Sequence, residues 1–201
     1  MADSLLDAVE FFQRLPRVAE QSAQLAINDV ARRGGMKLIR DQILDEIAFP
    51  KEYLKNPDRL GIKQFAKPGD LEAIIVARQR PTSLARFASG QPLGSKAKLG
   101  VKVTVGNGKS RVLRTAWLVR LKKGEQKSAD SYNIGLAVRV KPGESIVGKK
   151  GDHHSWLIPG SVALLYGPSI DQVFRGVSAD VAKPISRMVT EEFFRQFTRL
   201  A

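Results

Sequence analysis

The pattern of apolar and polar positions divides the chain into a helical beginning, a β-rich middle and a helical end. Near the N-terminus, Leu5, Val9, Phe12 and Leu15 recur at helical spacing after two residue types that favour a helix N-cap. Pro16 then either ends this helix or opens the next one at its first turn. The first fifteen residues are therefore predicted to be helical.

A second apolar stripe predicts a long amphipathic helix over residues 18–48. Gly34 and Gly35 lie inside this stripe, and two glycines can either cap one helix and begin another or sit within a continuous helix. We favour continuity, because no cluster of Pro, Asn or Ser follows them. Pro50 ends the pattern, and residues 51–56 predict one more short helical turn.

The middle of the chain changes to the two-residue period of β-strands. Residues 71–77 form a short, nearly continuous apolar run that is typical of a buried strand. Residues 81–98 are rich in Pro, Gly and Ser and predict an extended loop. Residues 101–105 alternate Val with polar side chains, the Gly-Asn-Gly at 106–108 is a strong hairpin signal, and a single return strand is expected after it. Residues 132–141 show the cleanest alternation.

The end of the chain returns to helical periodicity. Ser169 and Gln172 fit a capping box at the start of this helix. Pro184 lies inside the helical stretch and predicts a kink or a break. One face of the helix is apolar and consists of Val177, Val181, Ile185, Val189, Phe193, Phe197 and Leu200.

Together these elements predict an α+β fold: a long N-terminal helix, a central, mostly antiparallel β-sheet with long loops, and a C-terminal amphipathic helix. The expected segments are a helical part at 1–60, a basic β-rich core at 61–166 and a C-terminal helix at 167–201 that packs on the sheet. All three are expected to form one structural domain.

Composition narrows the protein class. The chain has 201 residues, a formal net charge of +13 and no Cys, which excludes disulfide scaffolds, thiolate zinc sites and Cys nucleophiles. No apolar run approaches the roughly 18 residues of a membrane span. The N-terminus is acidic and lacks a basic region followed by an apolar one, so no signal peptide is expected.

The positive charge is concentrated in the middle of the chain. Residues 78–127 hold thirteen basic residues and one acid, which is +12 of the total of +13. Such a block indicates a nearby polyanion or an acidic partner protein. Strand alternation predicts that three strands pack one apolar face and turn a positive face outward, toward a polyanion or an acidic partner. The expected outward residues are Lys102, Arg114, Arg120, Lys122, Arg139 and Lys141.

No motif indicates catalysis, a cofactor or a metal. The stretch 143–149 has the glycine spacing of a phosphate-binding loop, but Lys150 stands where a Ser or Thr should hold magnesium. The stretch 108–110 has the right ending, but it lacks the first Gly, and a strand follows it. His153 and His154 are the only histidines, and a polar loop explains them better than a metal site or a hydrolase does.

Two segments resemble a known family. The first is LAINDVAR at residues 25–32, and the second is LYGPSI at 165–170, followed by Val173 and Phe174. They resemble the minor tail protein Z family of tailed bacteriophages, also called tail completion proteins, from about residue 18 to the end. The chain departs from the family in the Gly pair at 34–35 and in an N-terminal extension.

The resemblance implies a structural virion protein without chemistry of its own. Such a protein is assembled in the host cytoplasm and acts at the head–tail junction as a ring of several copies, a hexamer in the family, around the DNA channel. Its neighbours would be the head-completion and the tail terminator or tube proteins, with packaged DNA nearby. The expected subunit interface consists of Tyr166, Gly167, Pro168, Val173, Phe174 and Phe194.

The alternative is a free, cytoplasmic protein that binds nucleic acid without sequence preference through a basic β-sheet face. A backbone-tolerant positive surface would serve both functions, because phosphate contacts carry no sequence information. No zinc finger or other sequence-reading motif is present. The charge pattern alone leaves the two functions open.

Overall fold

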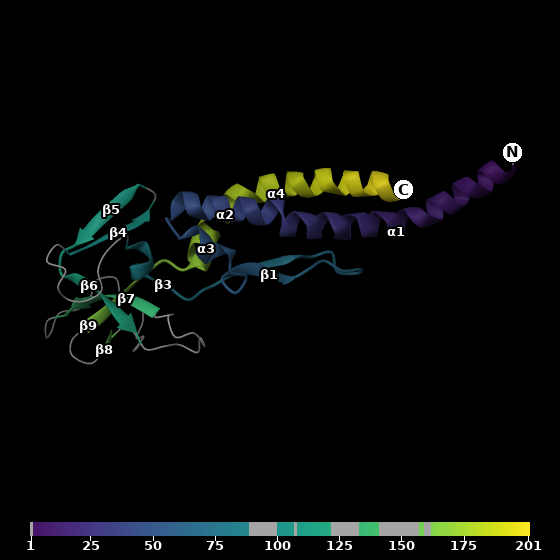
Figure 1. Cartoon of the computed structure of the whole chain (residues 1–201). Coiled ribbons are helices and arrows are strands. Elements are labelled where there is room, and N and C mark those ends of the chain that lie inside the picture. Colours follow the sequence, from purple (N-terminus) through teal and green to yellow (C-terminus); the bar gives the residue numbers. More distant parts are fainter. Residues whose placement is uncertain (1, 89–99, 107, 122–132, 141–156, 159–161) are drawn as a thin grey trace. The chain divides into compact units, whose positions relative to one another are not determined.

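The structure of the chain is a computed structural model, and Figure 1 shows it as a ribbon. The residues that it describes are 2–88, 100–106, 108–121, 133–140, 157–158 and 162–201. They contain a long N-terminal helix, antiparallel strands and a C-terminal helix, so the predicted α+β class is confirmed.

The elements follow one another in the order helix, strand, helix along the chain. The helices are α1 (Ala2–Arg32), α2 (Gly34–Glu46), α3 (Lys51–Lys55) and α4 (Ile170–Leu200), with a 3₁₀ turn at Leu84–Phe87. The strands are β1 (Leu60–Gln64), β2 (Ile74–Ala77), β3 (Thr82–Ser83), β4 (Val101–Gly106), β5 (Lys109–Leu113), β6 (Ala116–Leu121), β7 (Asn133–Arg139), β8 (Leu157–Ile158) and β9 (Val162–Gly167).

These elements form two compact units, a division that differs from the three consecutive segments expected from the sequence. The first unit combines Met1–Ile43, Leu54–Arg78 and Asp171–Ala201, and the second combines Leu44–Tyr53 with Gln79–Ile170. The C-terminal helix thus belongs to the unit that contains α1, and the larger sheet belongs to the other.

The junction of α1 and α2 is almost continuous, as favoured from the sequence. The backbone N–H of Arg33 donates to the carbonyl of Asp29 at 3.0 Å, and that of Lys37 donates to the carbonyl of Arg33 at 3.0 Å. The helical hydrogen-bond ladder therefore crosses the one-residue interruption. A Cβ atom on Gly35 would lie 2.9 Å from the carbonyl oxygen of Val30, so this close approach requires Gly.

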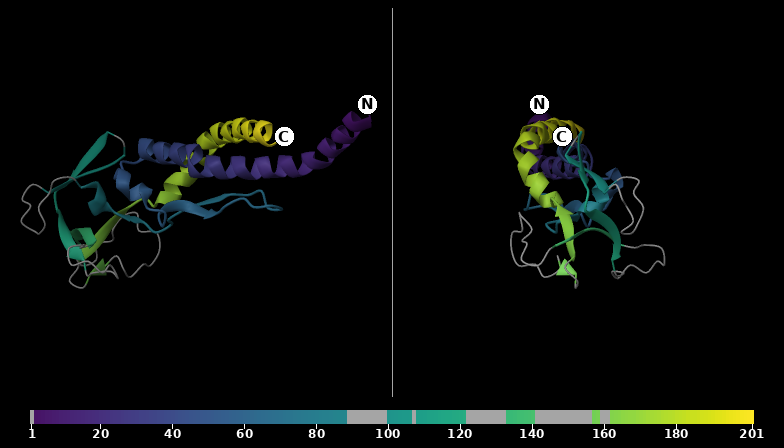
Figure 2. Two further views of the ribbon diagram at one scale, coloured as in Figure 1. Left: turned by 45° about the vertical axis from the view of Figure 1, so that its right-hand side comes forward. Right: turned by 90° about the vertical axis from the view of Figure 1, so that its left-hand side faces the viewer.

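Two proline residues lie inside long helices. Pro16 neither ends nor begins a helix, since α1 continues through it, and that expectation was wrong. Pro184 also lies within one continuous helix, α4, which changes direction along its length (Figure 2). A proline removes one backbone donor, and helices that contain one commonly bend.

The first unit is built on one face of α1. Ser22, Ala26 and Val30 follow one another at four-residue intervals and are buried. The C-terminal part of α4 runs beside α1, and the β1–β2 hairpin lies along it (Figures 1 and 2). Further buried apolar side chains of this unit are Ala31, Met36, Ile39, Ile43, Leu54, Leu60, Ala66, Val173, Val177 and Val181.

Polar side chains of α1 hold the loop of the β1–β2 hairpin. The side chain of Asn28 makes two hydrogen bonds to the backbone of Ala66: its Nδ2 donates to the carbonyl at 2.9 Å, and its Oδ1 accepts from the N–H at 2.8 Å. Farther along the loop, the N–H of Gly69 donates to Oε1 of Glu20 at 2.7 Å. The strand β1 was not predicted from the sequence, and its partner β2 lies within the predicted run at 71–77.

The second unit contains the larger sheet. Its strand order is β3-β9-β7-β6, with β8 paired to β9, and β4 and β5 form a separate two-stranded sheet. Phe49 stacks on Tyr53 and contacts Phe87, with ring centroids 5.9 and 5.4 Å apart, and all three are buried. The predicted loop at 81–98 thus begins with β3 and a 3₁₀ turn that buries Phe87, and residues 89–99 lie outside the described part.

We expect Asn28→Ala to lower the free energy of unfolding by about 1–3 kcal/mol, because it leaves the N–H of the buried Ala66 without its partner and leaves the Ala66 carbonyl with only the longer hydrogen bond from Gln24 Nε2, at 3.3 Å. Urea unfolding followed by circular dichroism would measure the change. The matched control is Asn56→Ala, which removes an exposed hydrogen bond to the N–H of Asp58 and should change stability by less than about 0.5 kcal/mol. Equal losses in both variants would contradict a special role for Asn28.

Candidate functional site

The sheet of β4 and β5 carries exposed positive charge. Lys102, Lys109 and Arg111 are exposed on its strands, and Arg114 is exposed directly after β5. The sequence from 100 to 121 contains no Asp or Glu. We call residues 101–114 with these four side chains the basic hairpin. A polyanion can approach it without repulsion from an acidic residue of the same segment.

The register of the basic hairpin places its charges on both faces. Lys102 pairs with Val112, and both are exposed, so this face meets solvent. On the other face Val103, which is buried, pairs with Arg111, which remains exposed. Gly108, with a φ of 73°, forms the turn, as the Gly-Asn-Gly signal predicts. The hairpin therefore has an outer face with Lys102 and Val112 and an opposite face with Arg111.

The expectation of one continuous positive face is wrong. In the β6–β7 pair, Arg120 lies opposite Ile134, and Trp117 lies opposite Ala137. Arg139 is two residues from Ala137, so it shares the face of Trp117, and its guanidinium lies 5.9 Å from the Trp117 ring centroid. Arg120 and Arg139 therefore lie on opposite faces, because the register between strands, and not alternation within each strand, decides which residues share a face.

The predicted return strand is also divided. A turn at Arg114 separates β5 from β6, and the two strands pair with different partners. Lys102 and Arg120 consequently belong to different sheets. Lys122 and Lys141 lie outside the described residues. Of the six residues expected to face a DNA channel or an acidic partner, the structure brings together only those of the basic hairpin.

The six residues expected at a subunit interface differ in exposure. Phe194 is 61% exposed on α4, which suits a surface contact, whereas Val173 is only 9% exposed and belongs to the core of the first unit. The other four are half-buried, and they are Tyr166, Gly167, Pro168 and Phe174. Among these six, Phe194 offers the largest exposed apolar surface.

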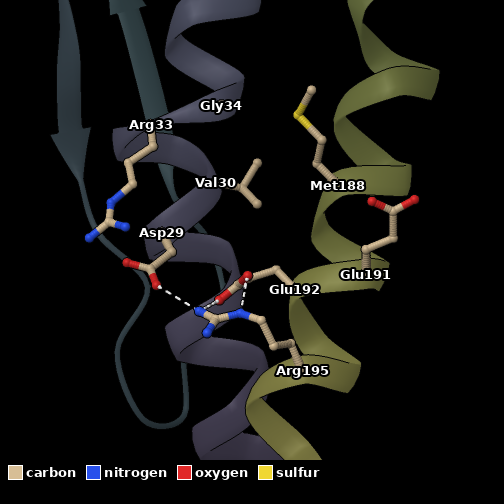
Figure 3. A pocket seen from close by; sticks show the side chains of 8 residues that line it. All are labelled: Asp29, Val30, Arg33, Gly34, Met188, Glu191, Glu192 and Arg195. Carbon is tan, nitrogen blue, oxygen red and sulfur yellow. Dashed lines mark hydrogen bonds and ion pairs between the residues drawn. The ribbon is translucent and has the colours of Figure 1, made fainter.

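A cluster of polar side chains joins α1 to α4, and Figure 3 shows Asp29, Glu192 and Arg195 of this cluster. Arg195 donates from Nε to Oε2 of Glu192 at 2.8 Å, and its Nη2 lies 4.0 Å from Oδ2 of Asp29. Gln196, which is buried, donates from Nε2 to Oε1 of Glu192 at 2.6 Å. Arg195 thus bridges a carboxylate of each helix.

The Arg195 guanidinium holds the pKa of Glu192 well below its usual range, at about 2, chiefly through their hydrogen bonds. Burial opposes this shift, and the hydrogen bond from Gln196 supports it. The side chain of Glu192 is 19% exposed and that of Arg195 is 59% exposed, so solvent screens the pair in part. The cluster therefore acts as an ionic contact between two helices.

A hollow of about 390 Å³ lies beside this cluster (Figure 3). Its wall contains three acidic and two basic side chains, which leaves little net charge to select an ion. Among the described residues, no group of three or more His, Asp or Glu side chains is placed to hold a metal. The residues that line the hollow are Asp29, Val30, Arg33, Gly34, Met188, Glu191, Glu192 and Arg195.

The remaining candidate motifs are the two glycine-containing stretches and the pair of histidines. The stretch 108–110 is the hairpin turn and the start of β5, which agrees with its interpretation as a turn. The stretch 143–149 and the two histidines at 153 and 154 lie outside the described part. None of the described helices is long and apolar enough to cross a membrane.

Comparison with known proteins adds no relative. No family model, no curated protein and no solved structure matches the chain.

The sequence did not reveal the contact between Asp29 and Arg195. The two residues are 166 positions apart in the chain, and periodicity alone assigns the polar residues of both helices equally to the solvent. A partial signal was present, because Glu192 and Arg195 have the spacing of a helical ion pair.

We expect Glu192→Gln to reduce the stability of the chain at pH 7 by about 1 kcal/mol, because it removes a partly exposed ion pair. A carboxyl with a lowered pKa stabilises the fold fully above its unfolded pKa of about 4.5, and this contribution is lost as the pH falls toward 2. The stability difference between wild type and variant should therefore shrink from pH 7 to pH 2.

Thermal unfolding at pH 7, 4 and 2.5 would measure this difference. The matched control is Glu191→Gln, because Glu191 is exposed and adjacent on the same helix. A wild-type advantage over Glu192→Gln that stays constant down to pH 2.5 would contradict the assignment.

Proposed function

We propose that the chain is a tail completion or neck protein of a tailed bacteriophage, which forms a ring around the DNA channel at the head–tail junction. The observation that carries this proposal is the basic hairpin, with four exposed basic side chains and no acidic residue in the surrounding segment from 100 to 121. Its charge suits a neighbouring phosphate backbone and provides no means of reading bases.

In a ring, the modest positive charge of each chain is multiplied by the number of copies. The basic hairpins of several copies together would line the channel with positive charge. Because these contacts do not depend on the base sequence, the DNA duplex can move through the channel. The groups assigned to DNA are Lys109, which begins β5 beside the turn, and Arg111, which lies on the face opposite Lys102 and Val112. The protein would act as a structural component of the virion.

The two segments that resemble tail completion proteins occupy structural positions in the fold. In the first, Ala26 is fully buried and Asn28 holds the backbone of Ala66. In the second, Gly167 ends β9, where a Cβ atom would lie 3.2 Å from the ring of Phe87, and Ser169 directly precedes α4. A relationship through the fold, rather than through shared chemistry, would place such residues at these positions.

The first test concerns the particle. If the proposal is correct, the chain is present in purified virions in several copies, and it localises between head and tail by immunoelectron microscopy. A particle that lacks the chain should have unjoined heads and tails. Absence of the chain from purified virions would refute the proposal and would leave a free nucleic acid binder as the remaining function of the basic hairpin.

The second test concerns the charge. We expect the wild-type chain to bind duplex DNA of any sequence, with a logarithmic affinity that falls linearly with the logarithm of the salt concentration. Lys109→Gln combined with Arg111→Gln should weaken binding and reduce this slope by about 2, one unit for each lost phosphate contact. Fluorescence anisotropy at several salt concentrations would measure both quantities.

The matched control for the charge is Lys183→Gln with Arg187→Gln, which removes the same charge from exposed positions on α4. It should leave the slope unchanged. An equal reduction in both variants would mean that net charge, rather than the basic hairpin, determines binding.

A further inference from the structure

The strand β2 is an apolar strand that the chain leaves exposed. Its run of apolar residues is typical of a buried strand, yet Val76 is 41% exposed and the other residues of the strand are only half-buried. β2 pairs with β1 on one side, and no strand in the described part of the chain pairs with its other side, which we call the open edge. Proteins usually protect such an edge with charge or Pro, and residues 73–77 contain neither.

The backbone of β2 presents hydrogen-bonding groups at the open edge. The N–H of Arg78 donates to the carbonyl of Arg59 at 2.8 Å, so the backbone groups of Val76, two residues earlier, are also directed toward β1. Ile75 and Ala77 flank Val76, and their N–H and carbonyl groups consequently point to the open edge, because successive residues of a strand alternate. A further strand can therefore extend the sheet there.

The charges beside the open edge change sign along the strand. Asp70 and Glu72 precede β2, Arg78 and Arg80 follow it, and no other charged residue lies between them. Glu72 and Arg80 are exposed, and Arg78 is half-buried. Among the described residues, neither Glu72 nor Arg78 takes part in an ion pair, whereas Asp70 pairs with Lys67 at 3.8 Å. A segment that is acidic before its centre and basic after it complements a second copy of itself that runs antiparallel.

We propose that the open edge of β2 pairs antiparallel with the same edge of a second copy of this chain, in the register that places Ile75 opposite its own copy. The pair is isologous, so it closes on two chains. In this register Glu72 lies opposite Arg78 of the second copy, twice in the dimer, and Val76 lies opposite Ile74. Backbone hydrogen bonds join the two hairpins into one continuous sheet, and the exposed Val76 gains an apolar neighbour.

The charges select this register. A shift by two residues in one direction places Glu72 opposite Val76, and the same shift in the other direction places Arg78 opposite Ile74. Each alternative therefore sets a charge against an apolar side chain, whereas the register centred on Ile75 pairs charge with charge at both ends.

The dimer goes beyond the proposed function and does not depend on it. A twofold pair forms no ring by itself, and it uses neither Lys109 nor Arg111. Two short strands make a small interface, so we expect a reversible dimer whose share rises with protein concentration.

Charge reversal tests the pairing and its register. Glu72→Arg makes both ends of β2 basic, and Arg78→Glu makes both ends acidic, so each variant alone places like charges opposite each other. Each should raise the dissociation constant of the dimer about tenfold or more, and sedimentation velocity should then show single chains of 22.1 kDa where the wild type forms dimers. An equimolar mixture of the two variants should recover the dimer, and so should the double variant Glu72→Arg with Arg78→Glu.

A disulfide tests the position of the twofold axis. The chain has no Cys, so Ile75→Cys introduces one thiol per chain. In the proposed register the two thiols lie on opposite residues, whose Cα atoms are about 5.5 Å apart, and mild oxidation should give a covalent dimer on a non-reducing gel. The matched control is Val76→Cys, which is more exposed but lies opposite Ile74, and it should cross-link much less.

Further controls separate the pairing from a general change of charge or of fold. Glu46→Arg and Arg187→Glu, at exposed positions of α2 and α4, make the same changes of charge away from β2 and should leave the dimer intact. Circular dichroism and thermal unfolding would verify that every variant keeps the wild-type fold.

The outcomes distinguish this pairing from the proposed function. A mass, of any size, that is the same for the wild type and for both single charge variants would overturn the pairing, and so would a double variant that behaves like the single ones. The presence of the chain in virions and the effect of Lys109→Gln with Arg111→Gln on DNA binding are independent of all these results.

Discussion

The first unit depends on the small side chains along one face of α1. Ser22 and Ala26 are fully buried, and side chains this small allow other elements to approach the helix backbone closely. The Ser22 hydroxyl donates to the carbonyl of Val18 at 2.6 Å, so its burial leaves no donor unpaired. Asn28 lies near this face and adds the two hydrogen bonds that hold the loop of the β1–β2 hairpin. Close packing and polar anchoring thus act on the same stretch of helix.

Local sequence patterns predicted much of the secondary structure, but they did not show which strands pair or in which register. The helix junction at Gly34, the turn at Gly108 and the strand around Leu136 followed from the sequence, because short-range backbone preferences determine each of them. The sequence did not show which face of the sheet carries Arg120 and which carries Arg139. Both faces of β6 and of β7 are largely apolar, so alternation could not indicate which face of β6 continues as which face of β7. When both faces of a sheet are apolar, the register between its strands cannot be predicted from a single sequence.

The same limit applies to the candidate sites. The sequence showed which part of the chain carries the excess positive charge. In the structure, four of these basic residues lie together on or directly after β4 and β5, in the basic hairpin. The bridge from Arg195 to Asp29 required the tertiary structure, because it joins helices from opposite ends of the chain. Charge is therefore distributed in two ways in this protein: paired groups join two helices of one unit, and the basic groups of the basic hairpin on the other unit are exposed to solvent.

The division into units also has a consequence for synthesis. The chain passes from one unit to the other after residues 43, 53, 78 and 170, so the first unit takes its helices from both ends of the sequence. While the ribosome produces the middle of the chain, the buried face of α1 has to wait for α4, which begins only at Ile170. Until α4 has been made, the small side chains along that face of α1 lack their neighbour, and a chain released before Ile170 would leave this face open to solvent.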